Sequence, residues 1–268
     1  MTLEPAAYEF LRVDLDADGI ALITLNRPDK LNAVRGSDHA EFGRVLRALA
    51  ADDRVKVAVV TGAGRAFSVG GDYSLVEQLA EPHARLRIMD EARDLVLGHL
   101  DLDKPVIAAV NGIASGAGAA FALLCDFVIA DRSARIADGH ILAALAAGDG
   151  GAIAWPLSAG IIKAKRYLLT GDFIPAEEAE RIGLITEVVD DGDCLDHAMT
   201  LARRLAGSPQ TAIRYTKRAL NQLMRDTAIR SFELSLALEM LSQDTGETAD
   251  IVTRWKRGRT PDHQGISG

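Results

Sequence analysis

The chain has 268 residues, enough for one large core or for a core domain with a smaller helical appendage. Hydrophobic residues make up 48% and charged residues 25% of it, which is typical of a globular protein. Its formal net charge of -8 repels phosphate backbones and argues against nucleic-acid binding, although a local basic cluster can still hold an anionic ligand.

The first two thirds of the chain alternate between strand and helix patterns. Residues 8–14 and 20–25 alternate apolar and polar positions on either side of an Asp-Ala-Asp-Gly turn, which predicts a hairpin. The alternation of strands, turns and helices that follows, without an internal repeat, predicts an α/β fold. Further strands are expected at residues 55–60, 106–110 and 127–130, and helices after Ser37 and over residues 85–100 and 116–124.

After about residue 189 the pattern becomes helical. Helices are expected over residues 195–205, 211–224 and 228–241, with a break at Ser208-Pro209. The last of these is apolar on more than one face, as is typical of a helix buried in a core or between subunits. We therefore expect a core over residues 1–190 and a helical region over residues 191–268 that helps to form an oligomer.

No targeting segment, membrane span or metal site is expected. The first 15 residues are charged and strand-like, which does not fit a signal peptide. Residues 105–125 carry no charge, but an Asn111-Gly112 turn in their middle favours a buried strand and helix over a membrane span. Cys125 and Cys194 form neither a metal-binding spacing nor a disulfide framework, which is typical of a cytoplasmic protein.

Three turns that follow predicted strands carry the chemistry. They are residues 25–33, containing Asn-Arg-Pro-x-x-x-Asn-Ala, and the glycine-rich residues 62–72 and 111–120. The second and third turns lead into predicted helices, whose free N–H groups and positive dipole ends favour anionic oxygen. Any one such turn is more often a place of close packing between helix and strand, and neither of these two has the spacing of the dinucleotide-binding fingerprint.

Taken together, in this order and at these separations, the turns resemble the enoyl-CoA hydratase/isomerase (crotonase) superfamily. The resemblance implies a spiral of ββα units, C-terminal helices that pack a homotrimer or a dimer of trimers, and an acyl-CoA substrate with no other cofactor. It extends along nearly the whole chain through residues 148–151, 168–171, 176–179, 183–189 and the Arg-Thr-Pro tail at residues 259–261.

The resemblance also implies site residues. Gly71 in the second turn and Ala117 in the third would each supply one backbone N–H to an oxyanion hole. A thioester enolate places negative charge on one oxygen, and preorganised donors in a dry site stabilise that charge by ~3 kcal/mol each. The basic residues of the first turn lie where the family contacts coenzyme A, and the alternative interpretation is that they are solvated charges on a loop. The implied substrate-binding positions are Arg27, Lys30, Ala33, Ser68, Asp72 and Tyr73.

The sequence departs from the hydratases of this family at two positions. Those enzymes use two glutamates to hold and move a water proton, and Ala120 and His140 stand at the corresponding places here. Because alanine cannot transfer a proton, the two-carboxylate hydration mechanism does not carry over. His140 can serve as acid or base near neutral pH. The alternative interpretation is a core histidine whose hydrogen bonds are satisfied within the protein. Asp149, nine residues on, could orient the ring or could instead be a helix N-cap.

Other carboxylates follow the second turn, in a segment that often borders the acyl pocket in this family. Exposed helix charges are the default interpretation for them. They are Glu77, Glu81, Asp90 and Glu91.

The leading functional hypothesis is an acyl-CoA lyase or isomerase with a backbone oxyanion hole and non-standard acid/base residues. The spacing of His140 and Asp149 is also similar to that of 6-oxocamphor hydrolase, a relative that cleaves carbon–carbon bonds in cyclic β-diketones. That enzyme has a further histidine where this chain has Ala117. A catalytically silent acyl-CoA binder is favoured by the missing glutamates and disfavoured by the His–Asp pair. RNA binding, known for some relatives, is disfavoured by the net charge of -8 and the lack of a Lys-rich helix.

Overall fold

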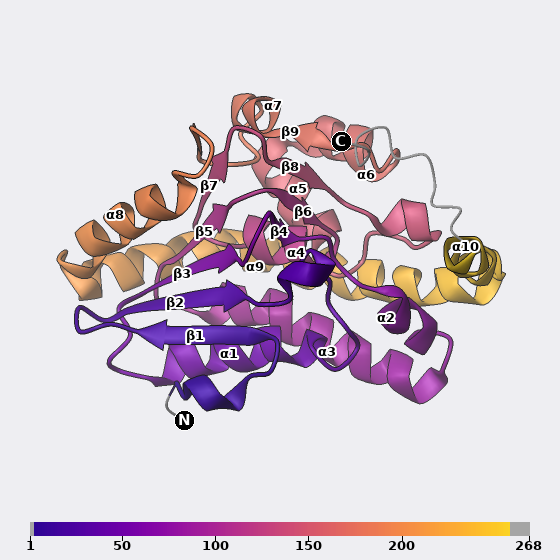
Figure 1. Cartoon of the computed structure of the whole chain (residues 1–268), viewed down its shortest axis with the longest axis horizontal. Coiled ribbons are helices and arrows are strands. Elements are labelled where there is room, and N and C mark those ends of the chain that lie inside the picture. Colours follow the sequence, from indigo (N-terminus) through magenta and orange to yellow (C-terminus); the bar gives the residue numbers. More distant parts are fainter. Residues whose placement is uncertain (1–2, 258–268) are drawn as a thin grey trace.

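A computed structural model describes residues 3–257, apart from the side chains of residues 5, 229, 255 and 256; the tail at residues 259–261 lies outside this range. Two sheets form the centre of the structure (Figure 1). In spatial order, the larger sheet contains β1 (Leu11–Leu15), β2 (Ile20–Leu25), β3 (Val57–Gly62), β5 (Val106–Val110), β7 (Phe127–Asp131) and β10 (Glu187–Val189). The smaller sheet contains β4 (Ala66–Ser68), β6 (Ile113–Ser115), β8 (Arg135–Ala137) and β9 (Ile174–Pro175).

The predicted hairpin is confirmed at the edge of the larger sheet. β1 and β2 run antiparallel, with Leu11 opposite Leu25. The Asp16 carboxylate in the turn accepts the N–H groups of Asp18 and Ile20, each at 2.9 Å. The other strands of this sheet pair in parallel, and β3 and β5 are buried at every residue. Such continuous apolar runs are expected for parallel strands that are covered on both faces.

Consecutive strands alternate between the two sheets. β3, β5 and β7 belong to the larger sheet, whereas β4, β6 and β8, which follow them in the chain, belong to the smaller one. Helices follow β4 and β6, so the chain repeats two strands and a helical segment. This confirms the predicted spiral of ββα units. The helices are α1 (His39–Ala51), α2 (Tyr73–Gln78), α3 (Pro82–Asp101), α4 (Ala117–Leu123), α5 (Gly151–Ala159), α6 (Ile161–Leu168), α7 (Ala176–Arg181), α8 (Cys194–Ala206), α9 (Gln210–Ser242) and α10 (Glu247–Lys256), and the 3-10 turn η3 (His140–Ala143) follows β8.

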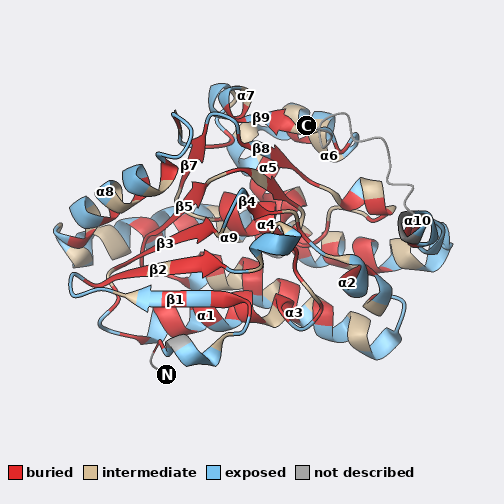
Figure 2. Cartoon of the chain, viewed as in Figure 1, coloured by how far each residue is buried: buried red, intermediate tan, exposed pale blue. Residues whose placement is uncertain are grey.

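Helices cover both faces of the larger sheet, so its central strands β3 and β5 are buried, whereas the edge strand β1 is partly exposed (Figure 2). α8 packs on one face, where Ala198 and Ala202 join Val59 in a cluster of buried side chains. The alternate strand residue Val60 points to the other face and joins the main core with Phe42 of α1. The period of two along β3 thus divides the core between the two faces.

The C-terminal helices differ from the prediction. Residues 211–224 and 228–241 belong to one 33-residue helix, α9, rather than to two. No proline or glycine interrupts this segment, and the exposed Asp226 and Thr227 are simply polar positions on its outer surface. The prediction of two separate helices was therefore wrong, whereas the predicted break at Ser208-Pro209 is confirmed, because it lies between α8 and α9. The buried face of α9 carries Ala228, Phe232, Leu236 and Met240 at intervals of four residues.

Other apolar side chains of α9 face outward in the single chain, as expected for a helix that meets another subunit. Leu234, Leu238 and Leu241 are 62%, 48% and 62% exposed. Because exposed apolar patches mark interaction surfaces, we expect this surface to meet another subunit, in the homotrimer or dimer of trimers that the resemblance implies. Sedimentation at micromolar concentration should show three or six chains, and a stable monomer would contradict this expectation.

The proposed boundary near residue 190 marks a change from mixed structure to helices. It does not mark a gap in packing, because α8 contacts β3, β5 and β7, and α9 contacts α3 and α5. The division into two regions therefore stays a prediction. Residues 105–125 form β5, β6 and α4, as their turn signal indicates. Within residues 3–257, no helix is long and apolar enough to cross a membrane.

Candidate active site

The second and third turns pack directly against each other, next to the parallel pair of β4 and β6. A Cβ atom on Gly70 would lie 2.7 Å from the carbonyl oxygen of Ser115, and one on Gly118 would lie 2.5 Å from the Cβ of Ser68. Gly70 and Gly116 also have positive φ angles of 82° and 51°. These glycines are therefore required by close packing and backbone conformation.

This packing leaves two backbone N–H groups beside a cavity of about 200 Å³. Gly71 is the last glycine of the second turn, and Ala117 is the first residue of α4, where an N–H has no partner within the helix. Among the residues that the structure describes, neither N–H donates a hydrogen bond. Both residues line the cavity, so the two positions implied for an oxyanion hole lie at the same place.

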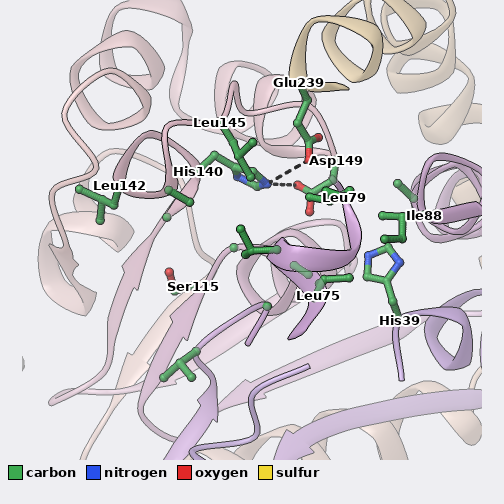
Figure 3. A pocket seen from close by; sticks show the side chains of 18 of the residues that line it. His39, Leu75, Leu79, Ile88, Ser115, His140, Leu142, Leu145, Asp149 and Glu239 are labelled. Atoms are coloured by element: carbon green, nitrogen blue, oxygen red, sulfur yellow. Dashed lines mark ion pairs between the residues drawn. The ribbon is translucent and has the colours of Figure 1, made fainter. Parts of the chain in front are cut away.

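The cavity has mostly apolar walls with a few polar groups (Figure 3). An apolar wall excludes water and lowers the local dielectric, which strengthens every electrostatic interaction inside. The apolar residues include Leu75, Val76, Leu79, Ile88, Leu142 and Leu145. The polar side chains are His39, Ser115, His140, Asp149 and Glu239.

His140 lies among three carboxyl groups. Its Nδ1 is 2.7 Å from Oδ1 of Asp138, which also accepts the backbone N–H of His140 at 3.1 Å. On the opposite edge of the ring, Nε2 lies 3.3 Å from Oδ1 of Asp149 and 3.9 Å from Oε1 of Glu239 (Figure 3). The Asp149 contact has ion-pair distance without hydrogen-bond geometry. Because Asp138 engages Nδ1, Nε2 is the nitrogen available to a ligand.

The carboxyl groups set the charge of the ring. Burial opposes a charged imidazole, but the carboxylates of Asp138 and Asp149 outweigh burial and hold the pKa of His140 well above its usual value. Burial acts to raise the pKa of Asp149 as well, yet His140 lowers that pKa on balance. At neutral pH the ring is therefore an imidazolium that can donate a proton from Nε2, and Asp149 is ionised.

The alternative interpretation of Asp149 as a helix N-cap is wrong. α5 begins at Gly151, its N-cap is Gly150, and no side chain makes a capping hydrogen bond. Asp149 instead faces the cavity. Gly151 has a separate reason to be glycine, since a Cβ there would lie 2.1 Å from Oδ2 of Asp138. The loop thus leaves room for both carboxylates that flank His140.

Arg27 and its neighbours form a structural ion-pair group. The Arg27 guanidinium donates to the carbonyl of Ala33 at 2.6 Å and pairs with Asp72 at 3.3 Å and with Asp38 at 3.6 Å. Asp72 also caps α2 by accepting the N–H groups of the helix's first turn. Arg27 is therefore not the solvated loop charge of the alternative interpretation. Arg27, Ala33 and Asp72 do not line the cavity.

The remaining implied substrate-binding residues also lie away from the cavity lining. Ser68 is fully buried, and its hydroxyl donates to the carbonyl of Asn32 at 2.8 Å. Lys30 and Tyr73 are exposed, with 46% of Tyr73 accessible. A role for these three residues toward the rest of a large ligand, outside the cavity, stays a prediction.

Comparison with known proteins assigns the chain to a family. Residues 16–264 match the sequence profile described as Enoyl-CoA hydratase/isomerase. The chain belongs to this family. The 1,2-epoxyphenylacetyl-CoA isomerase of Escherichia coli is 33% identical over 92% of this chain and 95% of its own length.

Comparison with solved structures places the chain in the same family. An enoyl-CoA hydratase/isomerase from Mycobacterium paratuberculosis has a TM-score of 0.89 and 38% identity, and the match covers 92% of this chain and 99% of that one. A β-diketone hydrolase from the cyanobacterium Anabaena sp. PCC 7120, bound to (S)-3-oxocyclohexyl acetic acid, has a TM-score of 0.83 and 27% identity, covering 89% and 95%. The predicted superfamily is confirmed.

Several polar groups of this enoyl-CoA hydratase/isomerase family member were not predicted as site residues. His39 lines the cavity, and its Nδ1 lies 3.2 Å from Oε2 of Glu91. Glu91 is only 9% exposed, so the interpretation of this residue as an exposed charge on a helix is wrong. Glu77, Glu81 and Asp90 are exposed, as that interpretation predicts. Within residues 3–257, no cluster of three or more His, Cys, Asp or Glu is arranged to hold a metal ion.

Glu239 is the least expected of these groups, because it comes from a helix that looks apolar. Its spacing is the signal in the sequence: it follows Phe232 by seven residues and Leu236 by three, which places it on the buried face of α9. Asp138 was visible two residues before His140, but only the turn η3 brings its carboxylate to Nδ1. That Ala120 stands where relatives have a catalytic glutamate stays a prediction.

Proposed function

We propose that the protein is an acyl-CoA lyase or isomerase that binds the thioester carbonyl between the N–H groups of Gly71 and Ala117 and moves a proton with His140. The observation that supports this proposal is that three residues with a donor available line one cavity. Two of these donors are backbone N–H groups without a partner among the described residues, and the third is the Nε2 edge of a buried imidazolium.

The backbone donors would act on the thioester oxygen. When a proton leaves the carbon next to the carbonyl, negative charge develops on that oxygen. Two fixed N–H groups stabilise this charge without having to reorganise, and the apolar wall keeps competing water away. Gly71 and Ala117 suit this position, because a small or absent side chain lets the carbonyl approach the backbone.

His140 would carry the proton. Asp138 fixes the ring through Nδ1, which leaves the Nε2 edge, beside Asp149 and Glu239, for a ligand in the cavity that these residues line. In the addition direction the ring donates the proton on Nε2 to the carbon next to the carbonyl of the enolate and becomes a neutral imidazole, and in the elimination direction that imidazole takes the proton back from the same carbon. Asp138 and Asp149 are positioning residues in this scheme, because they stabilise the charged ring.

One observation favours a second candidate, a β-diketone hydrolase without coenzyme A. His140 and Asp149 lie 3.3 Å apart, and the fold matches that of the Anabaena β-diketone hydrolase with a TM-score of 0.83. Ala117 counts against this candidate, since 6-oxocamphor hydrolase has a second histidine at that place. The shorter contact of the His140 ring, at 2.7 Å, is also with Asp138 rather than with Asp149 at 3.3 Å.

Calorimetry with acetyl-CoA separates the candidates, with free coenzyme A as the control for the nucleotide part. We expect acetyl-CoA to bind, and turnover of at least one member of an acyl-CoA panel. No binding of acetyl-CoA, together with hydrolysis of a cyclic 1,3-diketone, would support the hydrolase instead. Binding without turnover of any panel member would identify a silent binder.

A further inference from the structure

α9 places one carboxyl group in the cavity that the proton transfer described above does not use. Glu239 is 4% exposed and lines the cavity beside His140 (Figure 3). Its Oε2 is buried and has no hydrogen-bond partner among the residues that the structure describes. A buried polar atom without a partner is costly to folding, so a ligand atom that bonded to this oxygen would remove that cost.

The loop before α5 is shaped around this side chain. A Cβ on Gly148 would lie 2.4 Å from Oε2 and 2.6 Å from Cβ of Glu239 and 2.7 Å from the carbonyl oxygen of Ser235, so only glycine lets the loop approach α9 this closely. α9 is also fastened to the loop on both sides of Glu239. Ser235 donates to the carbonyl of Gly148 at 3.3 Å, and Ser242 accepts the N–H of Ala146 at 3.2 Å. The position of the carboxyl group is therefore built into the fold.

Charge balance determines which form of Glu239 is present. Three carboxyl groups surround one imidazole, at 2.7 Å for Asp138, 3.3 Å for Asp149 and 3.9 Å for Glu239. If all three carboxyl groups were ionised, they and the imidazolium together would carry a net charge of -2. The site that holds this charge is nearly closed to water. The carboxyl group farthest from the ring is the one that keeps its proton most easily.

The pKa of Glu239 agrees with its assignment as the protonated carboxyl group. Burial raises the pKa of Glu239 to about 8, even though His140 acts to lower it. Across the cavity lies His39 with its partner Glu91, and Arg85 of α3 donates to the neighbouring carbonyl of Met240 rather than to the carboxyl group. At neutral pH Glu239 is therefore a neutral acid in the lining of the cavity.

We propose that Glu239 is a specificity residue that donates a hydrogen bond to a second, oxo oxygen of the acyl group, so that the enzyme prefers oxoacyl thioesters over plain acyl thioesters. The inference rests on the proposed function, because the backbone N–H groups must already hold the thioester carbonyl. An oxo oxygen fits, since it can only accept a hydrogen bond and a neutral carboxyl group has one to donate.

Calorimetry with matched thioester pairs tests this inference. The pairs are butyryl-CoA with 3-oxobutyryl-CoA and pentanoyl-CoA with 4-oxopentanoyl-CoA, measured at pH 6.5. We expect the wild-type protein to bind at least one oxo compound about tenfold more tightly than its plain partner. For the 4-oxo pair, the preference should decline as the pH rises through about 8, because Glu239 then loses the proton that it donates.

Variants separate the hydrogen bond from general effects. Glu239→Leu should abolish the preference, whereas Glu239→Gln should keep it through the amide N–H and remove its pH dependence. Glu233→Gln is the matched control, because Glu233 lies on the same helix but is exposed and pairs with Arg93. Equal affinity within both pairs, or a preference that survives in Glu239→Leu, would overturn this inference alone. Failure of all four thioesters to bind would overturn the proposed function and the inference with it.

Discussion

Replacing His140 with alanine is expected to reduce turnover by about 10²- to 10⁴-fold while acyl-CoA binding changes little. The ring supplies the proton, whereas the thioester is held by backbone groups that the substitution leaves in place. kcat should therefore fall far more than affinity, as measured by steady-state kinetics and by calorimetry with the same thioester. His197→Ala serves as the control, since His197 is half exposed on α8 and does not line the cavity.

The pH profile of the wild-type enzyme provides a second test of His140 as the proton donor. The pKa of His140 is raised, so the ring stays protonated through neutral pH and loses its proton only on the alkaline side. If the imidazolium is the proton donor, kcat/KM should fall as the pH rises through that raised pKa, and it should not fall between pH 7 and 6. A His140→Ala variant with wild-type turnover would contradict the assignment.

Ala117→Pro is expected to lower turnover by about 10²- to 10³-fold, because it deletes one of the two N–H donors. The fold should survive, since proline is well tolerated at the first position of a helix and Ala117 is the first residue of α4. The preceding Gly116 has no Cβ to meet the proline ring. Full activity in a folded variant would show that the carbonyl is not held by this N–H.

The chain offers a matched control for this substitution. Ile161 is likewise the first residue of a helix, α6, and follows Gly160, a glycine with a positive φ of 79°. It is 57% exposed and does not line the cavity. Ile161→Pro should therefore leave turnover close to that of the wild type. A similar loss in both variants would indicate a general effect of proline rather than a lost donor.

Local sequence patterns predict the parts of the fold whose cause is local. The hairpin of β1 and β2 follows from period-two alternation around a turn, and β5 follows from a buried apolar run between turn signals. The single helix α9 was missed because the polar residues 225–227 resemble a break, although nothing in them prevents helix propagation. Deciding between a break and a solvated surface requires the contacts that α9 makes with α3 and α5.

The residues of the candidate site likewise include some that the sequence displays and others that only the fold brings in. Gly71, Ala117 and His140 lie in motifs that the sequence displays, and the structure brings them to one cavity. Glu239 reaches this cavity from a distant helix, 99 positions after His140 in the chain, and His39 reaches it from the start of α1. Only tertiary packing brings such residues together, so spacing alone could not reveal them.

A crystal structure of the protein with an acyl-CoA bound tests the central claim most directly. The account predicts that the thioester oxygen lies at about 3 Å from the backbone nitrogens of both Gly71 and Ala117, with the acyl group inside the cavity near Nε2 of His140. A thioester oxygen held by other groups, or an acyl chain that lies outside this cavity, would contradict it.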